Sequence, residues 1–206
     1  MDKVYPEPLL LPSSSPPNAS SSMTATREVF TLWMKSLVLN GNGCAVFDSD
    51  GQLAYRVDNY DSKCSDEVYL MDKHGTTLCK ILRRRFRVLG RWEGYRFHDL
   101  NGGEDKRPWF RVIKKSDGIL KSSEIRVMVG CSKGNEACYR VEGLGNKLVF
   151  KIKDLAGKTV AEVGRKQTER GVVLGEDVLM LVVEANIDRL LIMGLIVVCG
   201  LMKQNM

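Results

Sequence analysis

The sequence lacks the cysteine and histidine patterns that indicate a metal site or a disulfide framework. Its six cysteines are scattered without a CxxC pair, and it has only two histidines. Zinc sites and disulfide-stabilised secreted domains need such residues at recognisable spacings. We therefore expect free thiols, a reducing compartment such as the cytoplasm, and neither a metal nor another cofactor.

The sequence also lacks an apolar run of the length that a membrane-spanning helix needs. Leu190–Met202 contains no charged or polar side chain, but it has thirteen residues, whereas a crossing takes about 20. At about 1.5 Å per residue, the run reaches about 20 Å as a helix. It therefore predicts a helix surrounded by protein and no transmembrane segment. Asn186 or Asp188 is positioned to cap its start.

Proline is scarce outside the N-terminal segment. Residues 1–23 hold five of the six prolines, several serines and one short apolar run, Leu9–Leu11. This composition is typical of a disordered tail. Its apolar residues are too interrupted by polar residues and prolines for a signal peptide. We therefore expect a disordered Pro/Ser-rich tail over residues 1–25. The remaining residues, 26–206, are long enough to bury the core of one folded domain.

Turn residues separate short apolar-rich runs in the rest of the chain. The sequence Asp-x-x-Gly occurs at Asp48–Gly51, Asp72–Gly75 and Asp154–Gly157. Aspartate at the first position of a type I turn can bond its own backbone, and glycine at the fourth position tolerates the left-handed conformation. Each of these turns is therefore predicted to close a β-hairpin.

Alternation of apolar and polar residues predicts an antiparallel barrel. In KLVFKIKD, residues 147–154, leucine, phenylalanine and isoleucine point to one face and the lysines to the other. A long meander hides its edges by closing into a barrel, whose interior has to be filled. We predict a mainly β fold, a closed antiparallel barrel around a buried helix at about 187–203. Gly194 and Gly200 would let strand side chains approach that helix closely.

Four segments of the sequence resemble a known family of plant proteins. They are WMKSLVLNGNGCAVFDSDGQLAYRVDNY (33–60), DEVYLMDKHGTTL (66–78), GRWEGY (90–95) and DLAGKTVAEVGRKQ (154–167). In this order, and with the apolar C-terminal run, they resemble the plant LURP-one-related proteins over roughly residues 26–203.

The resemblance implies a tubby-like barrel of about twelve strands around a hydrophobic C-terminal helix, a fold also assigned to phospholipid scramblases. Family members are linked to basal defence against pathogens, and no enzymatic reaction is established for them. We therefore expect a defence-associated protein that is not an enzyme and has no catalytic residues. Tubby proteins bind phosphoinositides through basic residues of the barrel, but this likeness assigns no residue here. Scrambling is not expected, because no cysteine precedes Cys44 as a palmitoylation site.

Positive charge is concentrated in one segment of the sequence. Residues 80–96, KILRRRFRVLGRWEGYR, carry seven positive charges and one negative charge, a net of +6 that equals the formal charge of the whole chain. In an extended strand Arg83, Arg85 and Arg87 share one face. They are suited to the phosphates of anionic lipids such as phosphoinositides. Lys151 and Lys153 join this predicted lipid-phosphate site if the strands are neighbours.

Other interpretations of these charges stay open. The arginines can be solvated charges that keep an edge strand from pairing. The chain can also be a protein-interaction scaffold for an unknown partner, without a lipid or catalytic role. Nucleic-acid binding is disfavoured, because no recognised reading element accompanies the charges. Under the lipid hypothesis, we expect a monomer in the cytoplasm that binds peripherally at the inner face of the plasma membrane.

Overall fold

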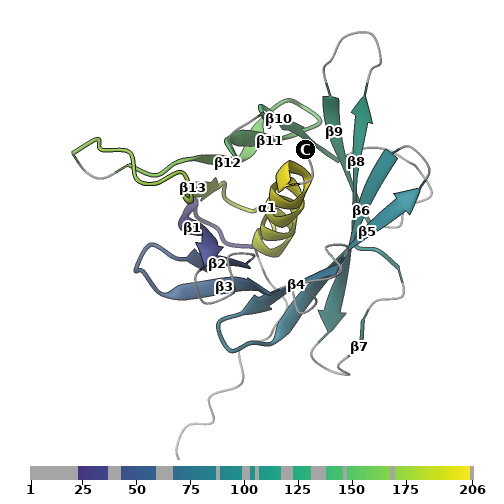
Figure 1. Cartoon of the computed structure of the whole chain (residues 1–206), viewed down its shortest axis with the longest axis horizontal. Helices are drawn as coiled ribbons and strands as arrows, with labels where there is room; N and C mark the ends of the chain where they lie inside the picture. The colour runs from purple at the N-terminus through teal and green to yellow at the C-terminus, as the bar shows by residue number, and fades with distance from the viewer. Residues whose placement is uncertain are drawn as a thin grey trace, which may run out of the picture.

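A ring of antiparallel strands surrounds one helix in the computed structural model of the chain (Figure 1). The structure describes residues 23–36, 43–58, 67–86, 89–98, 103–104, 107–116, 123–130, 138–145, 148–167 and 170–204. Most of the predicted tail, residues 1–22, lies outside the described residues.

The described residues contain the following strands and one helix. The strands are β1 (Glu28–Ser36), β2 (Gly43–Phe47), β3 (Leu53–Asp58), β4 (Glu67–Asp72), β5 (Thr77–Phe86), β6 (Leu89–His98), β7 (Gly103–Glu104), β8 (Phe110–Ser116), β9 (Ser123–Val129), β10 (Tyr139–Glu142), β11 (Phe150–Asp154), β12 (Thr159–Arg165) and β13 (Val178–Val183). The helix is α1 (Arg189–Gln204), against the expected range of 187–203.

Twelve of the described strands close into a barrel. They pair in the order β5-β4-β3-β2-β1-β13-β12-β11-β10-β9-β8-β6, and the pairing of β6 with β5 completes the ring. All of these pairings are antiparallel. Among the described strands, the short strand β7 pairs with β6 alone and lies outside the ring. The prediction of a closed, mainly β antiparallel barrel of about twelve strands around a C-terminal helix is confirmed.

The three Asp-x-x-Gly turns share one set of hydrogen bonds. The N–H groups of Gly51, Gly75 and Gly157 donate to the carbonyl oxygen of the turn's aspartate at 3.2, 3.2 and 3.1 Å. These glycines have φ angles of +75, +87 and +83°, in the left-handed region. The aspartate carboxylates accept further backbone N–H groups of the turns. The predicted hairpins β2–β3, β4–β5 and β11–β12 are therefore confirmed.

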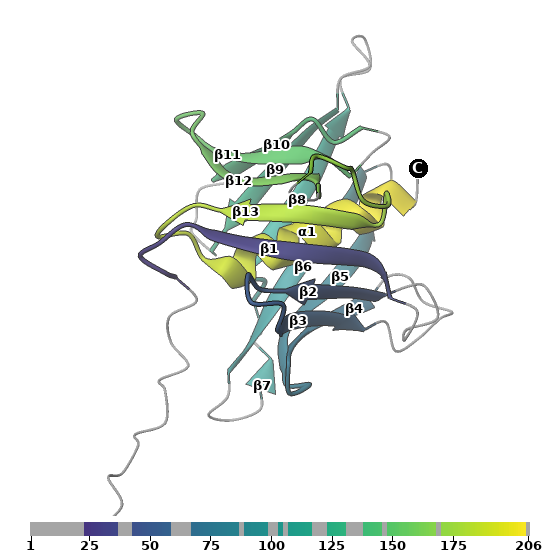
Figure 2. The same ribbon diagram turned by 90° about the vertical axis from the view of Figure 1, so that its left-hand side faces the viewer.

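The two ends of the barrel differ, because neighbouring strands alternate in direction. The three Asp-x-x-Gly turns lie at one end, which we name the turn end, and α1 begins there beside the bridge from Met23 to Asp188. Strands β5 and β12 each leave one of these turns and run to the opposite end, named here the far end. The β5–β6 connection and the segment between β12 and β13 therefore lie at the far end. Figure 2 shows α1 running lengthwise inside the barrel.

Helix α1 fills the barrel with apolar side chains. Residues 190–200 are all buried, and Ile192 and Val198 have no exposed surface. The helix begins at Arg189 because the Asp188 carboxylate accepts the N–H groups of Leu190 and Leu191, at 3.0 and 3.2 Å, and so caps the first turn. Among the described residues, no helix is long and apolar enough to cross a membrane.

The ring of Phe110 occupies space that two glycines leave open. Phe110 lies in β8 and is completely buried. A Cβ atom on Gly94 of β6 would lie 2.1 Å from its Cε1 atom, and one on Gly194 of α1 would lie 2.9 Å from the same atom. The expected close approach at Gly194 is confirmed, and at Gly200 a Cβ atom would lie 3.2 Å from Met34 Cε. Because both positions are glycine, strand β6 and helix α1 can both pack closely against the same aromatic ring.

Replacing Ile196 by lysine is expected to abolish soluble folding. Ile196 is 2% exposed, and an unpaired charge in an apolar core costs several kcal/mol, a large share of the roughly 5–15 kcal/mol that holds a domain folded. Circular dichroism and gel filtration of the soluble fraction measure the outcome. Leu155→Lys is the control, since that side chain is 61% exposed. A folded Ile196→Lys protein released from membranes would instead support a membrane anchor.

Adding one methyl group at Gly94 is expected to destabilise the barrel. Gly94→Ala forces the ring of Phe110 to move, and overpacking of this kind costs about 1–3 kcal/mol. Urea unfolding measures the loss, and a second change, Phe110→Leu, should recover part of it by vacating the ring position. Gly164→Ala is the matched control, because a Cβ atom there meets nothing within 4 Å. Equal stability of Gly94→Ala and Gly164→Ala would contradict the packing described here.

Candidate anion-binding site

Three arginines from neighbouring strands converge on one glutamate on the outer face of the barrel. Arg84 Nε in β5 lies 3.1 Å from Glu93 Oε2 in β6. Arg91 Nη2 and Arg111 Nε lie 2.7 and 3.3 Å from Glu93 Oε1. The hydroxyl of Tyr95 donates to Oε2 at 2.8 Å. We name these five residues the Glu93 cluster.

The strand register explains why these side chains meet. Glu93 follows Trp92, which is buried in the core, so its side chain points to the outer face. On β8 its direct partner is Arg111, and on β5 the partner of Arg91 is Arg84. The cluster is therefore a consequence of cross-strand pairing, with contributions from β5, β6 and β8.

The cluster buries its negative charge and exposes its positive charges. Glu93 is 3% exposed, whereas the side chains of Arg84, Arg91 and Arg111 are 51, 42 and 35% exposed. Three guanidinium groups and one carboxylate leave two positive charges in excess. Because each guanidinium carries five N–H donors, most donors of the cluster are not used by Glu93. The surface is suited to an anion with several acceptor oxygens.

Glu93 stays ionised at neutral pH. Burial by itself raises the pKa of Glu93, but the hydrogen bonds from Tyr95 and Arg84, together with the charges of Arg91 and Arg111, outweigh it and hold the pKa below its ordinary value. The hydrogen bonds of Arg84 to Tyr95 and Glu93 also raise the pKa of that arginine. The arginines are thus held by a permanent negative charge.

Arg83, the first residue of the predicted lipid-phosphate site, lies on the inner side of β5. It has the same parity as Cys79 and Ile81, which are fully buried, and it pairs with Trp92 of β6. Its guanidinium carbon lies 5.7 Å from the centroid of the Trp92 ring, a cation–π contact. The side chain of Arg85 and the whole of Arg87 lie outside the described residues.

Lys151 and Lys153 lie on the outer face of β11, away from β5. Their Nζ atoms are 3.4 Å from Glu162 and 2.6 Å from Glu142, respectively. Strands β6, β8, β9 and β10 separate β11 from β5. The structure therefore does not bring these lysines together with Arg83, and their role in lipid binding stays a prediction.

Strand β5 is not an edge strand. It pairs with β4 on one side and with β6 on the other. The interpretation of its arginines as charges that protect a free edge is therefore wrong. Arg84, Arg91 and Arg111 were missing from the predicted site because their convergence depends on cross-strand register. The one signal for it was Glu93, the single acidic residue within the basic segment.

The cysteines and the possible metal ligands among the described residues do not form a second candidate site. Burial raises the pKa values of the Cys44 and Cys199 thiols to about 12, so both stay protonated and unreactive at neutral pH. Cys79 and Cys138 are also free thiols. Within the described part of the chain, no three His, Cys, Asp or Glu side chains gather closely enough to hold a metal ion.

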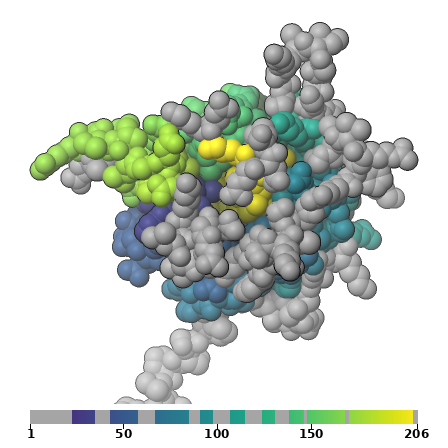
Figure 3. Space-filling model, viewed as in Figure 1, coloured from purple at the N-terminus to yellow at the C-terminus, as the bar shows by residue number. Residues whose placement is uncertain are grey.

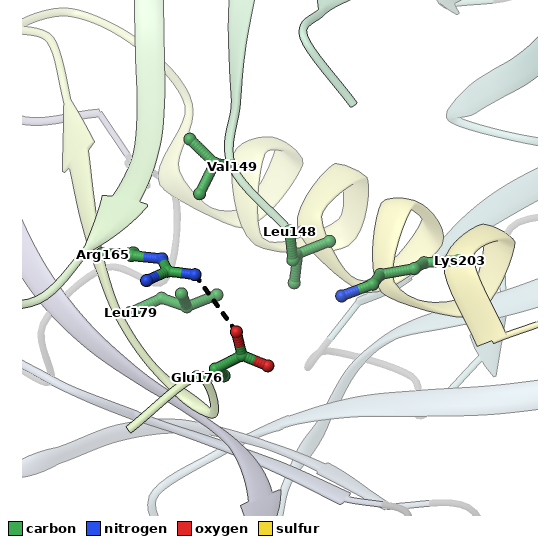
Figure 4. Close-up of a pocket in the computed structure, with 6 residues that line it drawn as sticks. All are labelled: Leu148, Val149, Arg165, Glu176, Leu179 and Lys203. Carbon is green, nitrogen blue, oxygen red and sulfur yellow. Dashed lines mark hydrogen bonds and ion pairs between the residues drawn. The ribbon is translucent and has the colours of Figure 1, made fainter. Parts of the chain in front are cut away.

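A small pocket at the far end has room for about one water molecule. Its volume is about 20 Å³. Figure 4 shows Arg165 and Glu176 on one side of it and Lys203 reaching towards it from the end of α1. Arg165 and Glu176, which both line the pocket, form an ion pair at 3.2 Å. A metabolite-sized substrate does not fit here.

The fold defines this molecule as a β-barrel that is filled by its own C-terminal helix. A solved X-ray structure of an Arabidopsis thaliana protein has this fold, with a TM-score of 0.62 and 18% sequence identity, covering 90% of this chain and 95% of that one. The family model for LURP-one-related proteins matches residues 28–200.

The chain belongs to the LURP-one-related family. It is 40% identical over 208 residues to the Arabidopsis thaliana protein LURP-one-related 11, covering 98% of this chain and 89% of the relative. It is also 40% identical over 187 residues to LURP-one-related 3 of the same plant, covering 88% and 82%. The resemblance found in the sequence is therefore confirmed.

Replacing Glu93 by glutamine is expected to destabilise the barrel by about 1–3 kcal/mol at pH 7, because charge-assisted hydrogen bonds to three arginines are weakened. The pKa of Glu93 is lowered by folding. Its stabilising effect is therefore complete above the unfolded pKa of about 4.3 and is lost as the pH falls through the folded pKa. Urea unfolding between pH 7 and pH 3 should show the two proteins converging at low pH.

The control for this measurement is Glu162→Gln. Glu162 lies on the outer face of β12, where its side chain is 48% exposed and pairs with Lys151. An exposed pair of this kind contributes between about 0 and 1 kcal/mol. A loss of stability in Glu93→Gln that is the same at every pH would contradict the charge-based role of Glu93.

Proposed function

We propose that this LURP-one-related protein binds the phosphate head groups of anionic membrane lipids, phosphoinositides among them, and has no enzymatic activity. The observation that carries the proposal is the Glu93 cluster, in which three half-exposed guanidinium groups surround one buried carboxylate. Its two excess positive charges would be neutralised by one phosphate monoester.

The geometry of the cluster favours phosphate over a single point charge. Guanidinium groups bind phosphate through paired N–H donors, and the buried carboxylate limits the motion of Arg84, Arg91 and Arg111 before a ligand arrives. Such pre-organisation reduces the conformational entropy that binding costs. The mutual repulsion of the three cations, which Glu93 only partly offsets, falls further when a phosphate binds.

The proposal moves the predicted site to other arginines of the same surface and begins with Arg84. Arg85 and Arg87 have the parity of Arg83, which lies on the inner side of β5, so their part in lipid binding stays a separate prediction. Arg91 and Arg111 are added, because they share the cluster. Lys151 and Lys153 are left as a separate prediction, since four strands lie between β11 and β5.

The cellular setting forms part of the same proposal. Because the twelve strands close into a ring, the barrel has no free edge for pairing with a second copy, which supports a monomer. Reversible binding at the inner face of the plasma membrane would let a cytoplasmic protein of this family act in plant defence. Anionic lipids are enriched in that leaflet.

The test is flotation with vesicles of phosphatidylcholine, alone or with a phosphoinositide, at physiological salt. Removing two cluster charges in Arg84→Gln, Arg111→Gln should reduce binding to the phosphoinositide vesicles about 30-fold, since each charge near such a surface contributes about 1 kcal/mol. Arg27→Gln, Lys158→Gln is the control with the same loss of charge at the turn end. Equal binding by both double variants would contradict the site, and absence of binding to any vesicle would favour a protein-interaction scaffold.

A further inference from the structure

Cations lie in a row across the outer wall of the barrel, at right angles to the strands. Each member of the row is the direct cross-strand partner of the next, from β5 through β6, β8, β9 and β10 to β11. In order, the members are Arg84, Arg91, Ile113, Arg126, Arg140 and Lys153. All of them except Ile113 are cationic. We name these six residues the cation row.

The side chains of the cation row point away from the core. Their neighbours along β9, β10 and β11, among them Val127, Val141 and Ile152, are buried in the core, so the row positions next to them face outwards. The exposed fractions of the five cationic side chains, in row order, are 51, 42, 39, 51 and 28%. A ligand in solution can therefore reach all five.

Neighbours in the cation row carry like charges. Arg84 lies opposite Arg91, and Arg140 lies between Arg126 and Lys153. Like charges directly opposite each other on neighbouring strands are destabilising. An anion bound along the row would offset this repulsion and so would gain binding free energy beyond its direct contacts.

Glutamates beside the row balance only part of its charge. Each lies two residues along a strand from a cation of the row, and they are Glu93, Glu124 and Glu142. Glu124 lies 2.7 Å from Arg126 Nη2 and 3.5 Å from Arg140 Nε. Glu142 lies 2.6 Å from Lys153 Nζ. With the third arginine of the Glu93 cluster included, six cations face three carboxylates, which leaves three positive charges in excess.

The cation row is long and bent. Neighbouring strands lie about 4.8 Å apart, so the five intervals between six strands give about 24 Å from one end of the row to the other. These six strands are half of the twelve-stranded ring, so the row bends around the wall. Figure 1 shows them from β5 and β6 at the right to β10 and β11 at the top. In Figure 3 their atoms lie along the same side of the molecule, outside the yellow atoms of α1.

This shape selects an extended chain as the ligand. A flat bilayer touches only part of a row that bends around half of the ring, and a single phosphate head group covers no more than the Glu93 cluster. An extended peptide covers about 24 Å with about seven residues, at about 3.3 Å each, and can follow the bend. Carboxylates suit the row, because guanidinium groups bind them through paired N–H donors.

A single-stranded nucleic acid, which is also a flexible polyanion, fits the surface less well. Proteins that bind single strands stack the bases on aromatic side chains. No member of the cation row is aromatic, and Tyr95 of the Glu93 cluster is 7% exposed, too little to stack on a base. The uncharged member of the row is Ile113, which suits an apolar side chain of a peptide.

We propose that the cation row binds an extended acidic segment of a partner protein, about seven residues long. Arg84 and Arg91 hold carboxylates at one end of the segment, and the cations of β9, β10 and β11 hold those at the other end. Because these two arginines also belong to the Glu93 cluster, the acidic segment and a lipid phosphate compete for them. The partner is thus bound in exchange for the lipid.

The first experiment measures the binding of a fluorescein-labelled peptide of seven glutamates by fluorescence anisotropy at low salt. Arg140→Gln, Lys153→Gln removes two cations of the row that lie outside the Glu93 cluster, and it should weaken binding about tenfold. Arg27→Gln, Lys73→Gln removes the same charge from exposed positions away from the row, and it should weaken binding less than about twofold. Circular dichroism confirms that each variant is folded.

The second experiment tests the length and the chemistry of the ligand. A peptide of three glutamates covers about 10 Å and should bind at least about tenfold more weakly than the peptide of seven. A single-stranded oligothymidine of the same charge should also bind more weakly. Flotation of Arg140→Gln, Lys153→Gln with phosphoinositide vesicles should be unchanged, because the Glu93 cluster is intact in this variant.

The outcomes separate the acidic segment from the proposed lipid. Equal weakening by both double variants, or equal binding of the short and long peptides, overturns the cation row as the site. Tighter binding of oligothymidine, or loss of flotation by Arg140→Gln, Lys153→Gln, assigns the row to nucleic acid or to lipid and overturns it as well. Flotation of the unaltered protein without peptide binding overturns the acidic segment alone, and peptide binding without flotation overturns the proposed function alone.

Discussion

The barrel depends on its own C-terminal helix to fill the space that twelve strands enclose. The contact at Phe110 shows how tight the fit is, because the ring lies where Cβ atoms on Gly94 and Gly194 would be. A barrel filled in this way has its core where many other barrels hold a ligand. The outer face and the ends are therefore the surfaces left for a ligand, and the cations of the Glu93 cluster lie on the outer face.

The arginines of one basic segment lie on both the inner and the outer side of the barrel wall. Because side chains alternate along β5, Arg83 stacks on the buried Trp92 ring while Arg84 reaches the outer face and Glu93. The inner arginine contributes to packing against Trp92, and the outer ones gather around the carboxylate of Glu93. The total charge of such a segment is therefore larger than the charge on the outer face of the barrel. On that face, the buried carboxylate of Glu93 orients the arginines.

Local signals in the sequence were sufficient for most of the fold. The three Asp-x-x-Gly turns form the predicted hairpins since their hydrogen bonds involve only neighbouring residues. The all-apolar run predicted the buried helix, and the family resemblance supplied the number of strands. The site was harder to predict, because alternation shows that Arg83, Arg85 and Arg87 share a face but not which face. Arg111 meets Glu93 only through the β6–β8 register, and it is the order of the strands in the ring that puts four strands between Lys151 and β5.

The bridge between Met23 and Asp188 places the start of the described chain beside the start of α1. Whatever precedes Met23 is therefore attached at the turn end, beside the first turn of the helix that fills the barrel. The entry to the first strand and the core helix are thus tied together at one point, although more than 160 residues separate Met23 from Asp188 in the sequence. A force or a partner that acts on the chain before Met23 meets the barrel where its core begins.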